Sequence, residues 1–153
     1  MGMVRVFHEV KLGEKGIRKF LSSLEADILE TLWEKGEARV KEIYEEVRKK
    51  RRMRGEDADF SQTTINLYCK KLLDKGLIEA SIRTGKGGLY YVFRPKVSRQ
   101  EFENMVVRRV LSEMIRDFPE ASYFFIKEAA STNLEELKRK LRELEEEGRR
   151  EGK

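Results

Sequence analysis

The spacing of apolar and polar residues predicts two helices near the start of the chain. Apolar side chains recur every three or four positions over residues 24–33, and Gly36 ends this segment. Ser22 and Glu25, three positions apart, form a capping box at its start. The same spacing recurs over residues 40–52, so we expect a second helix there.

A third helix, predicted from its N-cap Ser61 to a C-terminus near Gly76, has two unlike faces. Its apolar face consists of Ile65, Leu72 and Leu73, together with Cys69 or Tyr68. Its polar face carries Gln62, Thr63, Asn66 and Lys70, where a surface helix usually carries glutamate and lysine. No acidic side chain occurs from position 61 to position 73. The helix therefore presents short hydrogen-bonding groups and a cation on its solvent side.

Beyond residue 76 the apolar positions alternate with a period of two, which is typical of β-strands. The segments LIEASIR and LYYVFR show this alternation on either side of TGKGG, and Pro95 stops it. A glycine-rich link between two alternating segments predicts a β-hairpin. Three helices followed by a hairpin is the order of elements in a winged helix, so we predict a mainly α fold with a small antiparallel β-wing.

The remainder of the chain returns to helical spacing. Ser98 and Glu101 form another capping box, which opens a helix to about residue 116. Pro119 occupies the first position of the next helix. Thr132, with Glu135 three positions later, is expected to cap the last helix.

These last helices carry more apolar side chains than a segment of 56 residues can bury alone. Each such side chain contributes roughly 1.5–3 kcal/mol when it leaves water, so leaving them exposed is costly. We therefore expect a second copy of the chain to cover them in a homodimer. The predicted dimerisation residues are Phe102, Val106, Val110, Met114, Phe124, Phe125, Leu134, Leu137, Leu141 and Leu144.

The charges are divided unevenly between the two parts of the chain. Residues 1–97 hold 21 lysines and arginines against 15 acidic residues, whereas residues 98–153 hold 12 against 13. A basic part joined to a near-neutral part indicates a unit that binds a polyanion, carried by a unit that assembles. The small number of Gln, Asn and Cys beside many Glu, Lys and Arg is a weak compositional sign of a thermophilic source.

Two interpretations of the polar face of the third helix are open. It can be an ordinary solvated face, with small polar residues near a helix start acting as caps. In a helix-turn-helix arrangement, the same residues face base edges in the major groove of DNA. Gln62 and Asn66 suit adenine, Thr63 suits a thymine methyl, and Lys70 reaches guanine or phosphate. The basic charge and the predicted hairpin favour DNA binding.

The glycine-rich hairpin tip does not match a phosphate-binding loop, because it joins two strands and lacks the G-x-x-x-x-G-K-[ST] pattern. Its glycines are explained by a turn that needs positive φ. As a wing it also offers Arg83, Lys86 and Arg94 as contacts to the DNA backbone or minor groove. The run RKKRRMR, residues 48–54, suits the end of a helix, and we expect at most nonspecific attraction to phosphate from it.

Catalysis finds little support in the sequence. The single histidine, His8, lies in the N-terminal arm, and the single cysteine, Cys69, lies on the apolar side of the third helix. No catalytic pair, metal-ligand pattern or disulfide is predicted from them, so we expect no enzyme activity and no cofactor. No apolar run is long enough for a membrane span and no signal-peptide core is present, which favours the cytoplasm.

Several of these segments resemble one known family. The chain reads SSLEADILETLWEKG, VKEIYEEV, SQTTINLYCKKLLDKGLI and YVFRPKVS, and these segments are similar to the penicillinase-repressor family. The family's motifs are S-x-x-E and L-W-x-x-G in the first helix, S-x-x-T-[IV] opening the third, and Y-V-Y-x-P after the wing. The chain matches the first three, and at the last it reads YVFRP, with Phe93 in place of the second tyrosine. The similarity covers residues 21–98 well, and the later helices are similar in layout to the family's dimerisation helices.

The resemblance implies a homodimeric winged-helix repressor that blocks a promoter. By position, Ser61, Thr63, Thr64, Lys70 and Lys71 fall in the helix that enters the groove, and residues 83–94 form the wing. The family often has threonine where this chain has Leu67, so its base preference can differ.

Two switches known in the family do not carry over. Some members are inactivated by cleavage of an Asn-Phe bond, but here Asn104 is followed by Met105. Copper-responsive members use C-terminal cysteines, and this chain has none there.

We therefore predict a winged helix-turn-helix DNA-binding domain followed by a C-terminal helical dimerisation domain. The expected parts are a basic arm at 1–20, the DNA-binding domain at 21–97, the dimerisation domain at 98–148 and a disordered tail at 149–153. The predicted partners are double-stranded DNA and a second copy of the chain. The alternative is a winged-helix protein-interaction module in a larger assembly, without an operator of its own.

Overall fold

The computed structural model describes residues 9–152 of the chain. The first eight residues of the N-terminal arm, His8 among them, lie outside the described residues. The chain forms two compact units, Met1–Val106 and Val107–Lys153. Each unit is considered by itself below.

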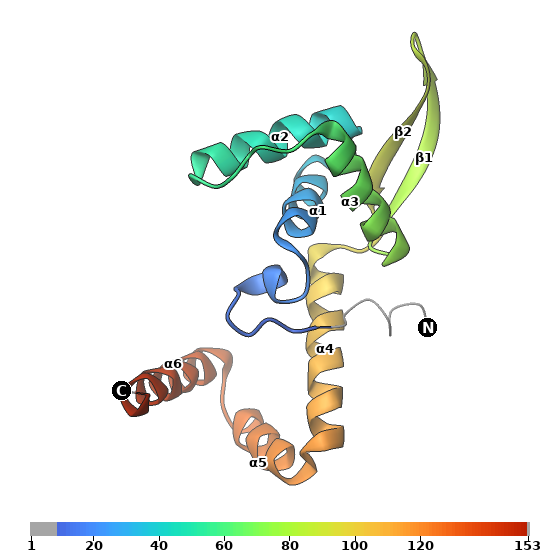
Figure 1. Cartoon of the computed structure of the whole chain (residues 1–153). Coiled ribbons are helices and arrows are strands. Elements are labelled where there is room, and N and C mark those ends of the chain that lie inside the picture. The colour runs from blue at the N-terminus through green and yellow to red at the C-terminus, as the bar shows by residue number, and fades with distance from the viewer. Residues whose placement is uncertain (1–8, 153) are drawn as a thin grey trace. The chain divides into compact units, whose positions relative to one another are not determined.

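Three helices form the body of the first unit, as the apolar spacing predicted: α1 (Ser23–Lys35), α2 (Val40–Met53) and α3 (Gln62–Asp74) (Figure 1). The capping box at α1 is present, because the Ser22 hydroxyl and the Glu25 carboxylate each accept a hydrogen bond from the other residue's backbone N–H. Gly36 ends α1 at φ 84°, a backbone angle that favours glycine.

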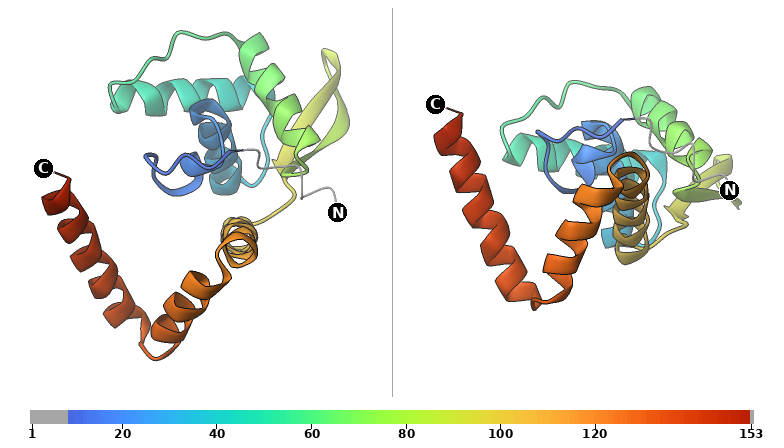
Figure 2. Two further views of the ribbon diagram at one scale, coloured as in Figure 1. Left: turned by 60° about the horizontal axis from the view of Figure 1, so that its bottom comes forward. Right: turned by 90° about the horizontal axis from the view of Figure 1, so that it is seen from below.

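The β-hairpin of the first unit is formed by β1 (Ile78–Gly85) and β2 (Gly88–Pro95), which pair antiparallel with Ile82 opposite Tyr91. The strands are longer than expected and leave only Lys86 and Gly87 as the turn. The backbone groups of Ala38 and Phe93 exchange two hydrogen bonds of 2.9 Å, so the link between α1 and α2 also pairs with β2. The hairpin lies beside α3 in all three views (Figure 1 and Figure 2). The first unit is thus a winged helix.

The core of the first unit collects apolar side chains from every one of its elements. α1, α2 and α3 contribute the inner residues of their stripes, among them Ile28, Ile43 and Ile65, all fully buried. The short 3-10 helix η2 (Gly16–Lys19) also packs here, because Ile17 and Leu21 belong to the same core. The second half of the expected N-terminal arm is therefore part of the folded unit.

The helix α4 (Arg99–Asp117) begins inside the first unit. Ser98 and Glu101 cap it as expected, with the Glu101 N–H donating to the Ser98 hydroxyl at 3.0 Å. Phe102 is fully buried and meets the Trp33 ring edge-on at 5.9 Å, and Val106 is 5% exposed. These first turns of α4 complete the core of the winged helix.

The second unit contains the rest of α4, followed by α5 (Pro119–Ala130) and α6 (Leu134–Glu151). Pro119 occupies the first turn of α5 as predicted. The expected cap of α6 is one residue off: Asn133 accepts from the Glu136 N–H, whereas the Thr132 hydroxyl donates to the carbonyl of Ala129. The helix α6 continues through residues 149–151, which were expected to be disordered. No helix among the described residues is long and apolar enough to cross a membrane.

Candidate nucleic-acid interface

The inner face of α3 fixes the helix in the first unit. Ile65, Cys69 and Leu72 are fully buried, as the apolar stripe predicted, and Tyr68 and Leu73 pack at its edge. Burial raises the pKa of the Cys69 thiol to about 12, so this group stays protonated and behaves as a small apolar side chain.

The outer face of α3 carries the residues that the sequence singled out. Gln62, Thr63 and Lys70 are exposed, while Asn66 is half-buried at one flank. None of these four side chains makes a hydrogen bond or ion pair within residues 9–152. Leu67 is also exposed, at 53%, and lies among them. In the sequence, Leu67 stands out only as a departure from the family pattern, and the polar pattern does not predict it as a site residue.

The first turn of α3 is held by a side-chain cap. The Ser61 hydroxyl accepts a hydrogen bond from the Thr64 backbone N–H at 3.2 Å, and the two hydroxyls lie 3.1 Å apart. Both side chains are therefore engaged in starting the helix, and the backbone N–H groups of Gln62 and Thr63 remain at its positive end. This end of α3 carries no acidic residue in its first turn.

The far end of α3 is tied to α1 by an ion pair. Lys75 Nζ lies 2.5 Å from Glu25 Oε2, and the Glu25 side chain is only 6% exposed. Burial alone would raise the pKa of Glu25, but hydrogen bonds from Lys75 and Ser22 bring it below its ordinary value. The pair fixes where α3 ends relative to α1.

A buried aspartate ties the segment before α3 to the body of the unit. Asp27, 1% exposed, accepts from Arg18 at 2.6 Å, Arg51 at 2.7 Å and Arg54 at 2.9 Å. Arg51 also donates to the backbone carbonyl of Asp57 at 3.1 Å. Burial alone would raise the pKa of Asp27, but the three guanidinium groups hold it below its usual range. The network thereby joins η2, α1, α2 and the loop that leads to α3.

Internal pairing also changes the expectation for the basic run at residues 48–54. Arg51 and Arg54 face Asp27, and Lys50 lies 2.7 Å from Glu34. Within this run, Lys49 and Arg52 are the exposed cations that pair with no described residue. Three of the six cations in the run therefore form ion pairs within the first unit.

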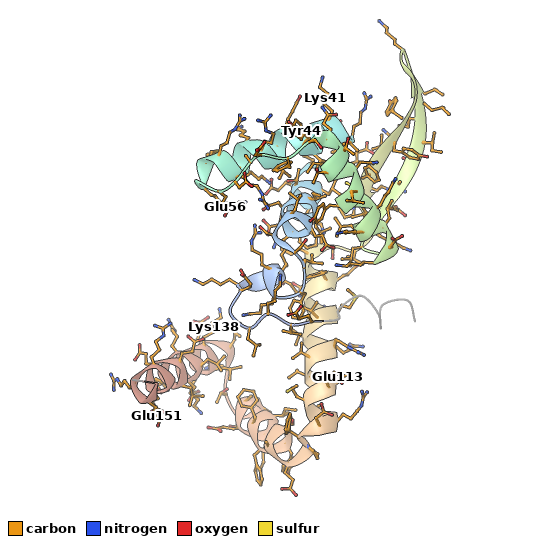
Figure 3. All side chains as sticks on the ribbon, in the orientation of Figure 1. Lys41, Tyr44, Glu56, Glu113, Lys138 and Glu151 are labelled. Carbon is orange, nitrogen blue, oxygen red and sulfur yellow. The ribbon has the colours of Figure 1, made fainter. Side chains whose placement is uncertain are left out.

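The cations of the hairpin differ in whether they are already paired with a carboxylate. Arg83 lies 2.7 Å from Glu37, and Arg94 lies 2.5 Å from Glu79, both in exposed ion pairs. Lys86, at the turn, has no ion pair with any described residue and is exposed. In Figure 3, Lys41 at the start of α2 points in the same direction as the hairpin tip. The outward side of α3 thus lies in a unit that also presents free lysines from α2 and the hairpin.

The second unit leaves most of its apolar surface uncovered. Among the predicted dimerisation residues, Phe124 is 67% exposed, Leu134 64% and Leu144 57%, and between 41% and 48% of Met114, Phe125 and Leu141 is exposed. Val110 and Leu137 are half-buried. Phe102 and Val106 differ: they lie in the core of the first unit, so the prediction that they face a second copy is wrong.

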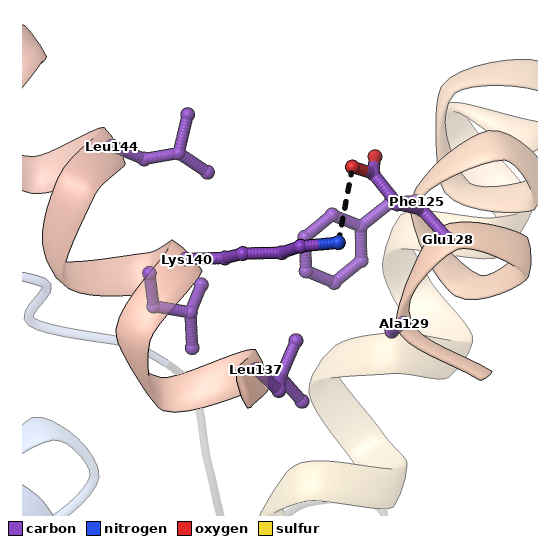
Figure 4. Close-up of a pocket in the computed structure, with 7 residues that line it drawn as sticks. Phe125, Glu128, Ala129, Leu137, Lys140 and Leu144 are labelled. Atoms are coloured by element: carbon purple, nitrogen blue, oxygen red, sulfur yellow. Dashed lines mark ion pairs between the residues drawn. The ribbon is translucent and has the colours of Figure 1, made fainter. Parts of the chain in front are cut away.

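Two apolar hollows lie on this unit. One, of about 360 Å³, is lined by α4 and α5 residues that include Leu111, Ile115 and Phe118. A smaller one, of about 50 Å³, lies between Phe125 of α5 and the leucines of α6, and Lys140 reaches across it to Glu128 at 4.0 Å (Figure 4). Phe125 lines both hollows.

Comparison with known proteins gives a family and two structural neighbours. The family model described as penicillinase repressor matches residues 21–143. A possible transcriptional regulator from Methanosarcina mazei Go1 is 16% identical, with 67% of this chain and 78% of that chain covered and a TM-score of 0.47. A mutant of Lactococcus lactis ZitR in complex with DNA is 18% identical, with 88% and 87% covered and a TM-score of 0.41. No curated protein matches the chain.

Proposed function

The chain belongs to the penicillinase repressor family of DNA-binding transcriptional regulators, and on this premise we propose that it is a homodimeric repressor. In this proposal α3 of each copy enters the major groove of one half of a two-fold operator. The protein acts in the cytoplasm, and it blocks a promoter by occupying it.

The outward face of α3 carries this proposal. Gln62, Thr63 and Lys70 are exposed and make no hydrogen bond or ion pair with any described residue, whereas much of the charge elsewhere in the first unit is paired internally. Amide and hydroxyl groups of this kind recognise base edges. The absence of acidic residues from position 61 to position 73 removes repulsion from phosphates. Asn66 and Lys71 flank this face.

The other residues predicted to contact DNA would assist α3 in different ways. Ser61 and Thr64 start the helix and direct its positive end at a phosphate. Lys86 offers a free cation at the hairpin turn. Arg83 and Arg94 are held in exposed ion pairs, which are worth about 0–1 kcal/mol, so a phosphate can replace the carboxylate at little cost.

The second unit supports the dimer. Its exposed apolar side chains from α4, α5 and α6 gain from burial against the same surface of another copy. A two-fold dimer presents two α3 helices to half-sites about 34–36 Å apart. An operator with an inverted repeat then matches the symmetry of the protein.

Selection of bound duplexes from a random pool, followed by footprinting on the selected sequence and upstream of the protein's own gene, tests this function. We expect an inverted repeat with two protected half-sites. Affinity should fall steeply with salt: if Lys41, Lys70 and Lys86 of both copies contact phosphates, the log–log slope is about −5. Weak binding that shows no sequence preference would instead support a winged-helix module that acts through protein partners.

A further inference from the structure

An apolar side chain occupies the middle of the polar outer face of α3. Leu67 is 53% exposed, although α3 is otherwise packed with its apolar residues inward. Among the large apolar side chains of α1, α2 and α3, only Met53, at the last position of α2, is also mostly exposed. Leu67 is not part of the core of the first unit. Its role therefore depends on the molecule that contacts the outer face of α3.

The neighbours of Leu67 restrict the class of that partner. On a helix, residues three and four positions away lie on the same side, which places Leu67 beside Thr63, Lys70 and Lys71. Lys71 lies over the ring of Tyr68 at 4.4 Å, and Lys70 is free of described partners. A wholly apolar protein surface placed on Leu67 would strip water from these lysines without compensation. The partner must therefore offer anions around a small apolar group.

The major groove of DNA meets both requirements. Phosphates line its edges, and the 5-methyl group of thymine is its characteristic apolar feature. The Thr63 methyl and the Leu67 side chain, one turn apart on α3, offer adjoining apolar atoms for such a group. The hydrogen-bonding side chains at Gln62 and Asn66 flank this small apolar patch.

We infer that Leu67 determines base specificity by packing against the 5-methyl group of a thymine in each half-site. This inference rests on the proposed function and adds a defined base and a defined chemical group to it. The inference gives the two residues different roles. Leu67 distinguishes between base sequences, whereas the charge of Lys70 contributes to affinity for every sequence.

Replacing thymine by deoxyuridine in the selected operator tests the inference, because this change removes only the methyl group. Each thymine of the half-site is replaced in turn, symmetrically in both halves, and the dissociation constant is measured at fixed salt. One position should weaken binding about fourfold per half-site, the value expected for one buried methyl group. In Leu67→Ala, binding to the thymine operator should weaken, and the difference between thymine and deoxyuridine at that position should shrink to the small part that the Thr63 methyl supplies.

Met53→Ala is the matched control, since it truncates another exposed apolar side chain of the same unit. It should retain the full sensitivity to the methyl group. Leu67→Ala should also keep the melting temperature of the wild type, because Leu67 lies outside the core.

Three results would overturn the inference while leaving DNA binding intact. The selected half-sites could lack thymine, deoxyuridine could have no effect at any position, or the methyl sensitivity could remain undiminished in Leu67→Ala. A wild-type protein that selects no duplex at all would overturn the proposed function itself, and the inference would fall with it.

Discussion

Arg51 Nε lies 2.7 Å from Oδ2 of Asp27, and this ion pair joins α2 to the buried N-terminal part of α1. Arg18 and Arg54 also form ion pairs with Asp27. Arg51 additionally donates a hydrogen bond to the backbone carbonyl of Asp57. The carboxylate thereby holds the segment that precedes α3.

Asp27→Asn should destabilise the protein at neutral pH by about 3 kcal/mol, the low end for a broken buried pair, because the arginines remain partly solvated. The folded-state pKa of Asp27 is below the unfolded value of about 3.9. Its stabilisation is therefore complete above that pH and is lost as pH falls through the folded pKa. Urea unfolding at pH 7 and at pH 3 measures the effect.

The difference between wild type and Asp27→Asn should shrink on acidification. Asp59→Asn, an exposed carboxylate of the same unit, should change neither the stability nor its pH dependence. A difference that stays constant between these two pH values would show that the Asp27 charge does not stabilise the fold.

The local features of the fold were readable from sequence, whereas the contacts between distant residues were not. The Ser22–Glu25 box and the Ser61 cap depend on neighbours three positions away, so their spacing predicts them. The pairs Asp27–Arg51 and Glu37–Arg83 join residues far apart in the chain. Nothing in the pattern of a charged run tells which of its cations turn inward.

The same limit explains the errors in the second part of the chain. Helical spacing shows that Phe102 and Val106 lie on an apolar face, but not which surface covers that face. The structure places them in the core of the first unit. At α6, Thr132 and Asn133 are both good caps, so the sequence could not choose between them.

Glu37→Gln should tighten binding to the selected operator, because it releases Arg83 from its ion pair and removes a negative charge near the hairpin. We expect a gain of about twofold to fivefold at low salt, in line with the small energy of an exposed pair. The gain should fade as salt rises. Fluorescence anisotropy over a salt series measures it.

Glu113→Gln makes the same change in net charge on the second unit and serves as its control. If it tightens binding as much as Glu37→Gln does, the effect comes from total charge and not from Arg83.

Lys70→Ala and Gln62→Ala should weaken DNA binding in different ways. Loss of Lys70 should lower the affinity for all sequences and reduce the salt slope by about one for each half-site. Loss of Gln62 should relax the preference at one base pair and cost about 1–3 kcal/mol if the amide contacts that base in two places. Binding to the operator and to single-base variants distinguishes them.

Both variants should melt close to the wild-type temperature, because both side chains are exposed. Unfolding of either variant would mean that this face of α3 packs against protein.

Phe124→Asp and Leu137→Asp should each convert the proposed dimer to monomers, since a carboxylate in an apolar interface loses its hydration without a partner. Light scattering at micromolar concentration measures the mass. Arg142→Asp introduces the same group on the polar side of α6 and should remain dimeric. A dimer that survives both apolar replacements would place the interface on another surface.

Photo-cross-linking from α3 tests the central claim most directly. A benzophenone side chain introduced at Thr63 should cross-link to one base position in each half-site of the selected operator, and the same group at Arg142 on α6 should give no DNA adduct. If the label at Thr63 reacts only with protein while the operator is bound, the outward face of α3 does not contact DNA bases.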